Sequence, residues 1–180
     1  MGRDAEADAA FTEFAVASRA RLRSTAYLLC GDWGRASDHV QEGLIRVYVA
    51  WPRLVRRGGE FAYARKAVVS AFLDASRKRS STERTQSEHR DRSSGEDVAR
   101  AVTDRAALMA ALVRLPERQR VCVVLRYFEE LDVRETAAAM RCSEGTVKSQ
   151  TSRALAALRS MFEEGSRAEL LVGGERNLQS

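Results

Sequence analysis

The 180-residue sequence contains only three cysteines, two histidines and two prolines. The cysteines, Cys30, Cys122 and Cys142, are far apart and odd in number, which excludes a complete disulfide framework and gives no paired zinc-ligand spacing. We interpret them as reduced, mostly packed thiols, and we predict neither a metal nor a cofactor. Nothing in the sequence indicates the rigid pocket that a hydrolase triad or a carboxylate pair would need, so we expect no enzymatic activity.

Long apolar runs are absent as well. No run approaches the roughly 18 residues that a membrane-spanning helix needs. Residues 1–10 lack the basic-then-apolar order of a signal peptide. We therefore expect a soluble, cytoplasmic protein that is not an integral membrane protein.

The scarcity of proline and of strand-like alternation favours an all-α fold. Apolar residues recur mostly with the helical period, which predicts a first helix that ends at Gly31 and a second that Pro52 stops. A third helix is predicted over residues 61–79. In the carboxyl half we expect Asp104 to cap one helix and Pro116 to lie in the first turn of the next.

Residues 80–103 differ in composition from the rest of the chain. They are rich in serine and charge and poor in large apolar residues, so they cannot bury enough surface to offset their ordering entropy. We interpret them as a flexible linker between two small helical domains. The amino-terminal domain, residues 5–79, is predicted to have three or four helices, and the carboxyl-terminal domain spans residues 104–162. For the tail, residues 163–180, we favour disorder over a short regulatory extension.

Positive charge is concentrated in the amino half. The formal net charge is +5, but residues 53–79 alone hold eight lysines and arginines against two acidic residues, Glu60 and Asp74. Such a cluster attracts phosphate, because each neutralised phosphate releases condensed counterions. A solvated arginine-rich face is the alternative interpretation, and charge alone does not decide between the two.

Residues 132–158 have the pattern of a helix-turn-helix. Asp132 and Glu135 have the spacing of a capping box, and the helix that they begin is predicted to end near Met140. A three-residue turn follows, and Ser143 is placed to cap the next helix. Two helices joined by so short a turn are typical of a helix-turn-helix.

The second helix of this motif has two different faces. Its inward face is apolar and small, with Val147, Thr151, Ala154 and Leu158 at helical spacing. The opposite face suits a helix pressed into the major groove, because it carries Gly145, Thr146, Lys148, Ser149, Ser152, Arg153 and Ala156. In the preceding turn, Arg141 stands where the backbone tends towards positive φ, which costs a residue other than glycine of order 1 kcal/mol. An ordinary helical hairpin is the alternative, but the cap, the turn and the apolar positions together favour DNA binding.

Residues 115–159, LPERQRVCVVLRYFEELDVRETAAAMRCSEGTVKSQTSRALAALR, resemble the fourth region of the extracytoplasmic-function (ECF) RNA polymerase sigma factors almost end to end. In that family this region is a helix-turn-helix that reads the −35 promoter element. The resemblance implies that the −35 element is contacted by Arg141, Thr146, Lys148, Ser149, Ser152 and Arg153.

The amino half resembles the second region of the same family. Residues 38–48, which begin Asp-His-Val-Gln-Glu, match the helix that docks on the polymerase clamp. The resemblance implies that polymerase is bound by Asp38, Gln41 and Glu42. The spacing alone favours a plain solvated face, since these residues lie off the apolar stripe, and the resemblance reverses this preference. His39 is interpreted as a solvated helix residue.

Residues 50–79 resemble the segment that reads and melts the −10 element. Opening a duplex requires the capture of unstacked bases, for which a basic path with aromatic pockets is suited. The resemblance implies that this path is formed by Arg56, Arg57, Phe61, Tyr63, Arg65, Lys66 and Arg77. Phe61 and Tyr63 would fit an apolar core as well.

The order of the two regions predicts a sigma factor, which binds core RNA polymerase and directs promoter-specific initiation. Its implied partners are core RNA polymerase, promoter DNA and an anti-sigma factor. The main alternative is a one-component regulator with a carboxyl-terminal helix-turn-helix, but residues 5–79 are too small and basic to enclose a ligand. A third possibility, a helical adaptor that binds only protein, does not account for the concentrated positive charge.

Overall fold

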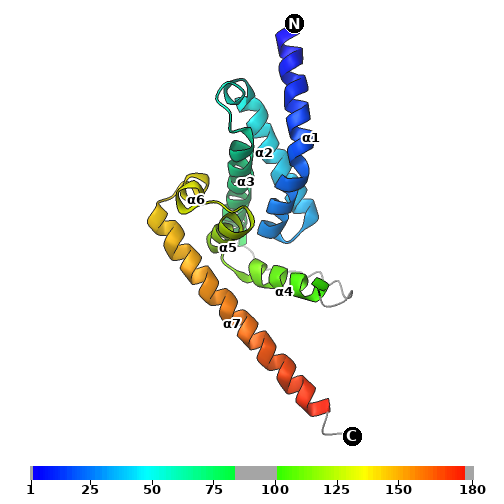
Figure 1. Ribbon diagram of the computed structural model, residues 1–180, viewed down its shortest axis with the longest axis vertical. Coiled ribbons are helices and arrows are strands. Elements are labelled where there is room, and N and C mark those ends of the chain that lie inside the picture. The colour runs from blue at the N-terminus through cyan, green and yellow to red at the C-terminus, as the bar shows by residue number, and fades with distance from the viewer. Residues whose placement is uncertain (1, 84–100, 177–180) are drawn as a thin grey trace.

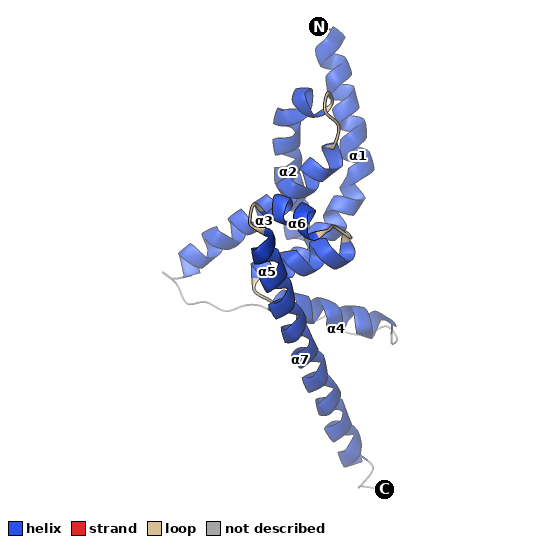
Figure 2. Cartoon of the chain, turned by 60° about the vertical axis from the view of Figure 1, so that its left-hand side comes forward, coloured by secondary structure: helices blue, strands red, loops and turns tan. Residues whose placement is uncertain are grey.

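The computed structural model describes residues 2–83 and 101–176, which are helical almost throughout (Figure 1, Figure 2). The elements in chain order are α1 (Gly2–Cys30), α2 (Trp33–Leu54), α3 (Glu60–Glu83), α4 (Ala101–Arg114), α5 (Glu117–Val123), the π-helical η1 (Val124–Phe128), α6 (Val133–Met140) and α7 (Glu144–Arg176). The described residues contain no strand, so the all-α fold class is confirmed. Within those two ranges, no helix is long and apolar enough to cross a membrane.

The amino half is a bundle of three helices, in which α1 and α3 both pack against α2. Apolar residues at helical spacing face its interior, and Leu22, Val47 and Phe72 are almost completely buried. Gly43 sets the separation of α2 and α3, because a Cβ atom there would lie 2.7 Å from Cγ2 of Val68. Only glycine permits the two helix backbones to approach this closely.

Local residues set the ends of α1 and α2. Gly31, with a φ of +71°, follows the last residue of α1, as the sequence predicted. The Asp32 carboxylate then caps α2 by accepting the Arg35 N–H at 2.7 Å. The predicted stop at Pro52 is wrong, because α2 continues to Leu54. A proline in the last turn removes only one backbone donor near the helix end, so the helix is not broken there.

The carboxyl half contains α4, α5, η1, α6 and α7. Asp104 was predicted as an N-cap but lies inside α4, because residues 101–103 ahead of it are also helical. Pro116 directly precedes α5 and does not lie in its first turn. These shifts leave the apolar faces of the helices in place, since Leu112 and Leu115 are buried.

The long helix α7 contains most of the residues that were predicted to be a disordered tail. It runs from Glu144 to Arg176 and extends away from the rest of the chain (Figure 1). The expectation of disorder is therefore wrong for residues 163–176. This segment contains no proline and several good helix formers, among them alanine, glutamate, leucine and arginine, so the helix can continue.

The predicted linker falls mostly on residues 84–100, which lie outside the described residues. At its edges α3 extends to Glu83 and α4 begins at Ala101, so both ends of the 80–103 segment are helical. The proposed domain boundaries remain predictions.

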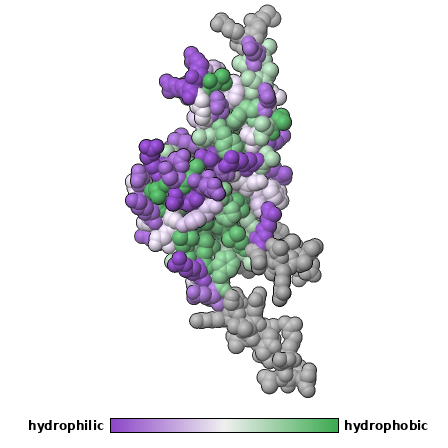
Figure 3. Space-filling model, viewed as in Figure 1, coloured by the Kyte–Doolittle hydropathy of each residue, from purple (hydrophilic) through white to green (hydrophobic). Residues whose placement is uncertain are grey.

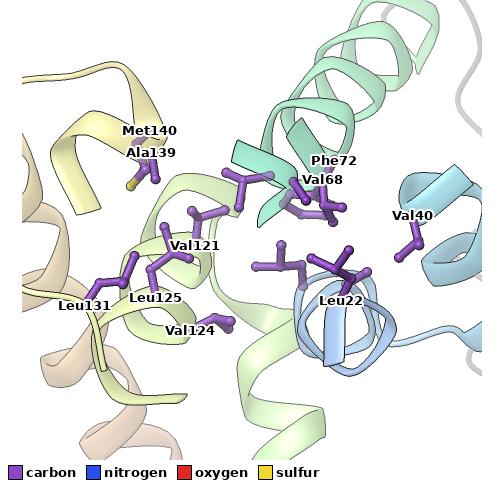
Figure 4. Packing of buried hydrophobic residues seen from close by; sticks show 14 of the residues in the cluster. Leu22, Val40, Val68, Phe72, Val121, Val124, Leu125, Leu131, Ala139 and Met140 are labelled. Carbon is purple, nitrogen blue, oxygen red and sulfur yellow. The ribbon is translucent and has the colours of Figure 1, made fainter. Parts of the chain in front are cut away.

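The two halves pack against each other and share one apolar core (Figure 4). Leu22 and Phe72 of the amino half belong to the same buried cluster as Val121, Leu125 and Met140 of the carboxyl half. Helices α1 and α3 both contact α5 across this junction. The sequence predicted two domains but gave no sign of this contact between them.

Arg120 is buried at the junction of the two halves. Its Nη1 donates to the Leu29 carbonyl at 2.5 Å, near the end of α1. Its Nη2 donates to the carbonyls of Val113 at 2.7 Å and Leu115 at 2.9 Å. A guanidinium at this position also faces the negative end of the α1 helix dipole. One side chain thus joins α1, α4 and α5.

Candidate nucleic-acid interface

The predicted helix-turn-helix is formed by α6, a tight turn and the start of α7. The Asp132 carboxylate accepts the Glu135 N–H at 2.7 Å, and the Glu135 carboxylate accepts the Asp132 N–H at 2.9 Å, which confirms the capping box. Arg141 ends α6 in the left-handed region, with a φ of 52°. Ser143 Oγ accepts the Thr146 N–H at 3.1 Å and so caps α7. Each local feature that the sequence indicated is present.

Helix α7 presents one face to the protein and another to solvent. Val147, Ala154 and Leu158 are buried, as predicted. Arg141 is exposed in the turn and Thr146 is half-buried, and the other predicted contacts to the −35 element are exposed, namely Lys148, Ser149, Ser152 and Arg153. Hydrophilic side chains dominate the surface over α6 and the start of α7 (Figure 3). All six residues are therefore at least partly accessible on the helix-turn-helix.

A hollow of about 350 Å³ lies beside this face. Lys148 and Ser152 line it, and Arg126 and Arg159 add two further guanidinium groups. Sequence reasoning missed both arginines, although Arg159 lies at helical spacing from Ser152. The basic surface around α7 is thus wider than the sequence predicted.

The residues predicted to contact the −10 element fall into an exposed and a covered group. Arg56 and Arg57 form the exposed group at the turn between α2 and α3, where hydrophilic side chains gather (Figure 3). Tyr63 and Arg56 line a hollow of about 290 Å³ together with Arg46 and Arg53. This surface combines several cations with one aromatic ring.

Phe61 and Arg65 form the covered group. The half-buried Phe61 ring has the guanidinium carbons of Arg21 and Arg65 at 4.6 Å and 5.7 Å from its centroid. The Arg65 side chain is only 12% exposed, and its Nη1 lies 3.2 Å from Oε2 of Glu129. The sequence placed Arg65 on an open basic path, whereas the carboxyl half covers it in the structure. Arg21, which no motif singled out, belongs to the same cluster.

Lys66 and Arg77 occupy other positions on α3. Lys66 is half-buried, whereas the Arg77 side chain is 79% exposed and pairs with Asp74. Burial tends to raise the pKa of Asp74, but hydrogen bonds from Arg77 and Arg46 outweigh it and hold that pKa below its ordinary value. Ionised Asp74 therefore offsets part of the positive charge of α3.

The residues predicted to bind polymerase lie exposed along α2. Asp38, Gln41 and Glu42 form a polar face there. Two exposed apolar residues continue this face, since Ile45 is 53% exposed and Val49 is 79% exposed. Sequence reasoning missed them, although successive steps of four residues from Gln41 put them in line. Exposed apolar residues rimmed by polar ones are typical of protein-binding surfaces.

His39 is buried, so its interpretation as a solvated residue is wrong. It is 7% exposed, and its ring packs edge-on against Phe72 with 5.8 Å between the centroids. The spacing along α2 turns it towards α3. Burial lowers the pKa of the imidazole below its ordinary value of 6.5, and the nearby charges of Arg35 and Arg79 lower it further.

We expect the protein to lose stability as the pH falls below 6.5. Because the pKa of His39 is depressed in the folded state, the unfolded chain takes up the proton first, and the free energy of unfolding falls below the ordinary histidine pKa of 6.5. Urea midpoints at about pH 7.5 and about pH 5.5 would measure the fall. His39→Leu should remove most of it, and an equal fall in that variant would contradict the assignment to His39.

The cysteines show the features of packed thiols. Cys30 and Cys122 are buried and Cys142 is half-buried. Burial, with a further contribution from neighbouring Cys142, raises the pKa of the Cys122 thiol to about 11, and burial also raises the pKa of Cys30. The part of the chain that the structure describes has no group of three or more side chains that could hold a metal ion.

Comparison with known proteins identifies the same two regions in this chain. Residues 15–82 match Sigma-70 region 2, and residues 105–158 match Sigma-70, region 4. The RNA polymerase sigma-E factor of Streptomyces avermitilis is 35% identical over 153 residues, which are 85% of each chain. That of Streptomyces coelicolor is 36% identical over 83% of this chain and 84% of its own. The ECF RNA polymerase sigma factor SigL of Mycobacterium tuberculosis is 30% identical over 76% of this chain and 79% of its own.

Solved structures share the helical architecture. The sigma factor RpoE, in complex with the anti-sigma factor NepR from Bartonella quintana, has a TM-score of 0.70 at 23% identity and covers 85% of this chain and 96% of its own. CnrH, in complex with the cytosolic domain of CnrY, has a TM-score of 0.62 at 19% identity and covers 89% of this chain and 94% of its own. Both likenesses concern the fold.

A helical chain with an exposed helix-turn-helix and a second basic surface belongs to the class of DNA-binding transcription factors. The two matched regions and the relatives identify the family within this class. The chain belongs to the sigma-70 family, in its ECF group. It is a sigma factor, which directs promoter-specific transcription initiation. Sigma factors are initiation factors and not enzymes.

Proposed function

We propose that the chain docks on core RNA polymerase through the exposed face of α2 and divides promoter recognition between its two halves. In this proposal α7 reads the −35 element as duplex, and the amino half captures the −10 element as the duplex opens. The observation that supports the division is the presence of two separate basic surfaces, one on α7 and one at the turn between α2 and α3. The chain would act in the cytoplasm and catalyse no reaction itself.

The −35 part of the proposal rests on the exposed face of α7. Lys148 and Arg153 carry positive charge that can reach phosphates or guanine edges. Ser149 and Ser152 between them are small, so the helix can approach the groove closely. The Ser149 hydroxyl donates to the Thr146 carbonyl at 3.0 Å, which leaves its oxygen as an acceptor for base donors.

The −10 part rests on Arg56, Arg57 and Tyr63. Arg56 Nε donates to the Pro52 carbonyl at 3.1 Å, which orients its guanidinium at the edge of the hollow that Tyr63 lines. Cations that follow a backbone beside an aromatic ring are the usual components of single-strand binding, because each unpaired base can stack on the ring. This surface is accessible in the structure as it stands.

A protein that sequesters the chain is also part of the proposal. RpoE was solved in complex with the anti-sigma factor NepR, and CnrH was solved in complex with the cytosolic domain of CnrY. By family membership, we propose that an anti-sigma factor binds this chain and keeps it from polymerase.

Reconstituted transcription tests the proposed function directly. Purified chain and core RNA polymerase would be combined, and the genomic fragments that this holoenzyme binds would serve as templates. Transcripts with defined start sites are expected only when both components are present. Equal, unspecific initiation with and without the chain would reject the proposal.

Charge reversal at Asp38 and Glu42 together is expected to weaken binding to core polymerase by at least about tenfold, since exposed interface charges that face a complementary surface become repulsive when reversed. Helicity should be unchanged, because Arg46, the ion-pair partner of Glu42, keeps its second partner Asp74. Pull-down on core polymerase with a circular-dichroism control would measure both. Reversal of the exposed Glu6 and Glu13 on α1 provides the matched control. Unchanged binding in the α2 variant would exclude this docking face.

A further inference from the structure

Three donors of the amino half converge on one anion. Glu129 Oε2 lies 3.1 Å from Arg21 Nη2 and 3.2 Å from Arg65 Nη1, and Glu129 Oε1 lies 2.5 Å from Thr25 Oγ1. Arg21 and Thr25 are on α1 and Arg65 is on α3, whereas Glu129 follows η1 in the carboxyl half. The donors therefore form an anion-binding site on one half, and a side chain of the other half fills it.

The backbone around Glu129 is shaped to deliver this side chain. The π-helical turn η1 ends directly before it, with the Glu129 N–H donating to the Val124 carbonyl five residues earlier at 3.1 Å. The next residue, Glu130, has a φ of 55°, in the left-handed region. Both features are uncommon, and π-helical turns are frequent at functional sites. The Glu129 side chain is 6% exposed, whereas Glu130 lies in solvent.

The chemistry of the site matches a phosphodiester group. A carboxylate held by two guanidinium groups and a hydroxyl presents two oxygens that share one negative charge, as the non-bridging oxygens of a phosphodiester do. Arginine is the residue best suited to bind such planar or forked oxygen pairs. Phe61 adds a ring beside the same two arginines, so that an adjacent base could stack. Ring, cations and hydroxyl together favour single-stranded nucleic acid over a small inorganic anion.

We propose that Arg21, Thr25 and Arg65, with Phe61, form a binding site for a phosphodiester of single-stranded DNA, and that Glu129 occupies this site until the two halves separate. The inference rests on the proposed role of the amino half at the −10 element. It adds a site to that role, because Arg21 and Thr25 lie outside the predicted −10 residues, and it assigns Glu129 as an internal competitor of DNA. Arg56, Arg57 and Tyr63 remain accessible in the closed chain, so the closed form binds single strands weakly and the open form binds them tightly.

The test compares two glutamate variants of the full chain. Glu129→Gln removes the competing charge, and Glu130→Gln removes the same charge from the neighbouring exposed position, so general electrostatic attraction changes equally in both. The probe is a fluorescent single-stranded DNA of about 15 nucleotides and mixed sequence, measured by anisotropy. We expect Glu129→Gln to bind at least about tenfold more tightly than Glu130→Gln, because apparent affinity rises with the fraction of open chain.

Two further measurements identify the site itself. In the Glu129→Gln chain the slope of log affinity against log salt should steepen by about 0.7 for each additional phosphate that the protein neutralises. Adding Arg21→Ala to Glu129→Gln should abolish the increase in affinity. Equal binding by the two glutamine variants, or an increase that survives Arg21→Ala, would overturn the proposal. If circular dichroism shows that Glu129→Gln does not fold, Glu129→Asp replaces it. The aspartate side chain is one methylene shorter and holds its carboxylate further from the arginines, so Glu129→Asp must bind the probe more tightly than Glu130→Asp does.

This outcome is separable from the proposed function. The anisotropy assay needs no polymerase, whereas the proposed function is tested by initiation with wild-type chain and core polymerase. If the wild-type chain directs initiation but Glu129→Gln binds single-stranded DNA no more tightly than Glu130→Gln, only the additional site is rejected. If the wild-type chain does not direct initiation, the proposed function itself is rejected.

Discussion

Replacing Lys148 and Arg153 together by alanine should weaken binding to double-stranded promoter DNA by roughly 2–6 kcal/mol, because each lost base or phosphate contact costs roughly 1–3 kcal/mol. Both side chains are exposed on α7, so folding should be unaffected. Transcription from a template already opened around the start site should remain close to that of the wild type, because this step no longer depends on reading the duplex. Electrophoretic mobility shift of the holoenzyme and transcription from both templates would measure the two effects.

The matched comparison is the pair Arg56→Ala and Arg57→Ala in the amino half. These changes should leave closed-complex binding partly intact and impair opening, the reverse of the α7 pair. Permanganate footprinting on linear and pre-melted templates separates the two steps. If both pairs of variants fail equally on the pre-melted template, the division of promoter recognition between the halves is wrong.

Arg120→Met should lower the free energy of unfolding by about 3 kcal/mol or more, because three carbonyls lose their donor and each unsatisfied buried group costs roughly 1–3 kcal/mol. The guanidinium is 6% exposed and donates to the carbonyls of Leu29, Val113 and Leu115. Methionine fills similar space but leaves these acceptors without that donor, and each unsatisfied buried group is costly. Urea unfolding followed by circular dichroism would measure the loss.

Arg118→Met is the matched control, because Arg118 lies two residues earlier on α5 and is exposed. Its effect should stay within about 0.5 kcal/mol, as for most surface substitutions. Because Arg120 also joins the two halves, its loss should broaden or split the unfolding transition, whereas the control should keep a single one. A loss as small as that of Arg118→Met would show that Arg120 contributes little to the junction.

The features that the sequence predicted correctly depend on neighbouring residues. The capping box of Asp132 and Glu135, the left-handed Arg141 and the cap at Ser143 each follow from residues within a few positions of one another. The buried face of α7 follows from a period of 3.6. Such short-range patterns predicted the fold class and most of the helix-turn-helix. The helix ends predicted at Pro52 and Asp104 were wrong, because the residues that flank them are also compatible with helix.

The features that the sequence did not predict depend on contacts between distant residues. Glu129 meets Arg65 across 64 positions and Arg21 across 108, and Arg120 meets Leu29 across 91. A glutamate and an arginine in a charged chain have no local pattern that marks them as a buried pair. His39 was misread for a related reason, since its burial depends on α3 lying against that side of α2.

Because of the π-helical turn η1, the contact between the two halves depends on the number of residues that precede Glu129 as well as on the side chains around it. A π-turn contains one residue more than the α-helical geometry requires. If the same five residues, Val124–Phe128, adopted regular α-helical geometry instead, the extra residue would rotate everything after them by roughly 100°. Glu129 would then point away from α1 and α3 although no residue had been substituted. In homologous chains, an insertion at this position that no wider turn takes up would matter more to the closed arrangement than many exchanges of side chain around it.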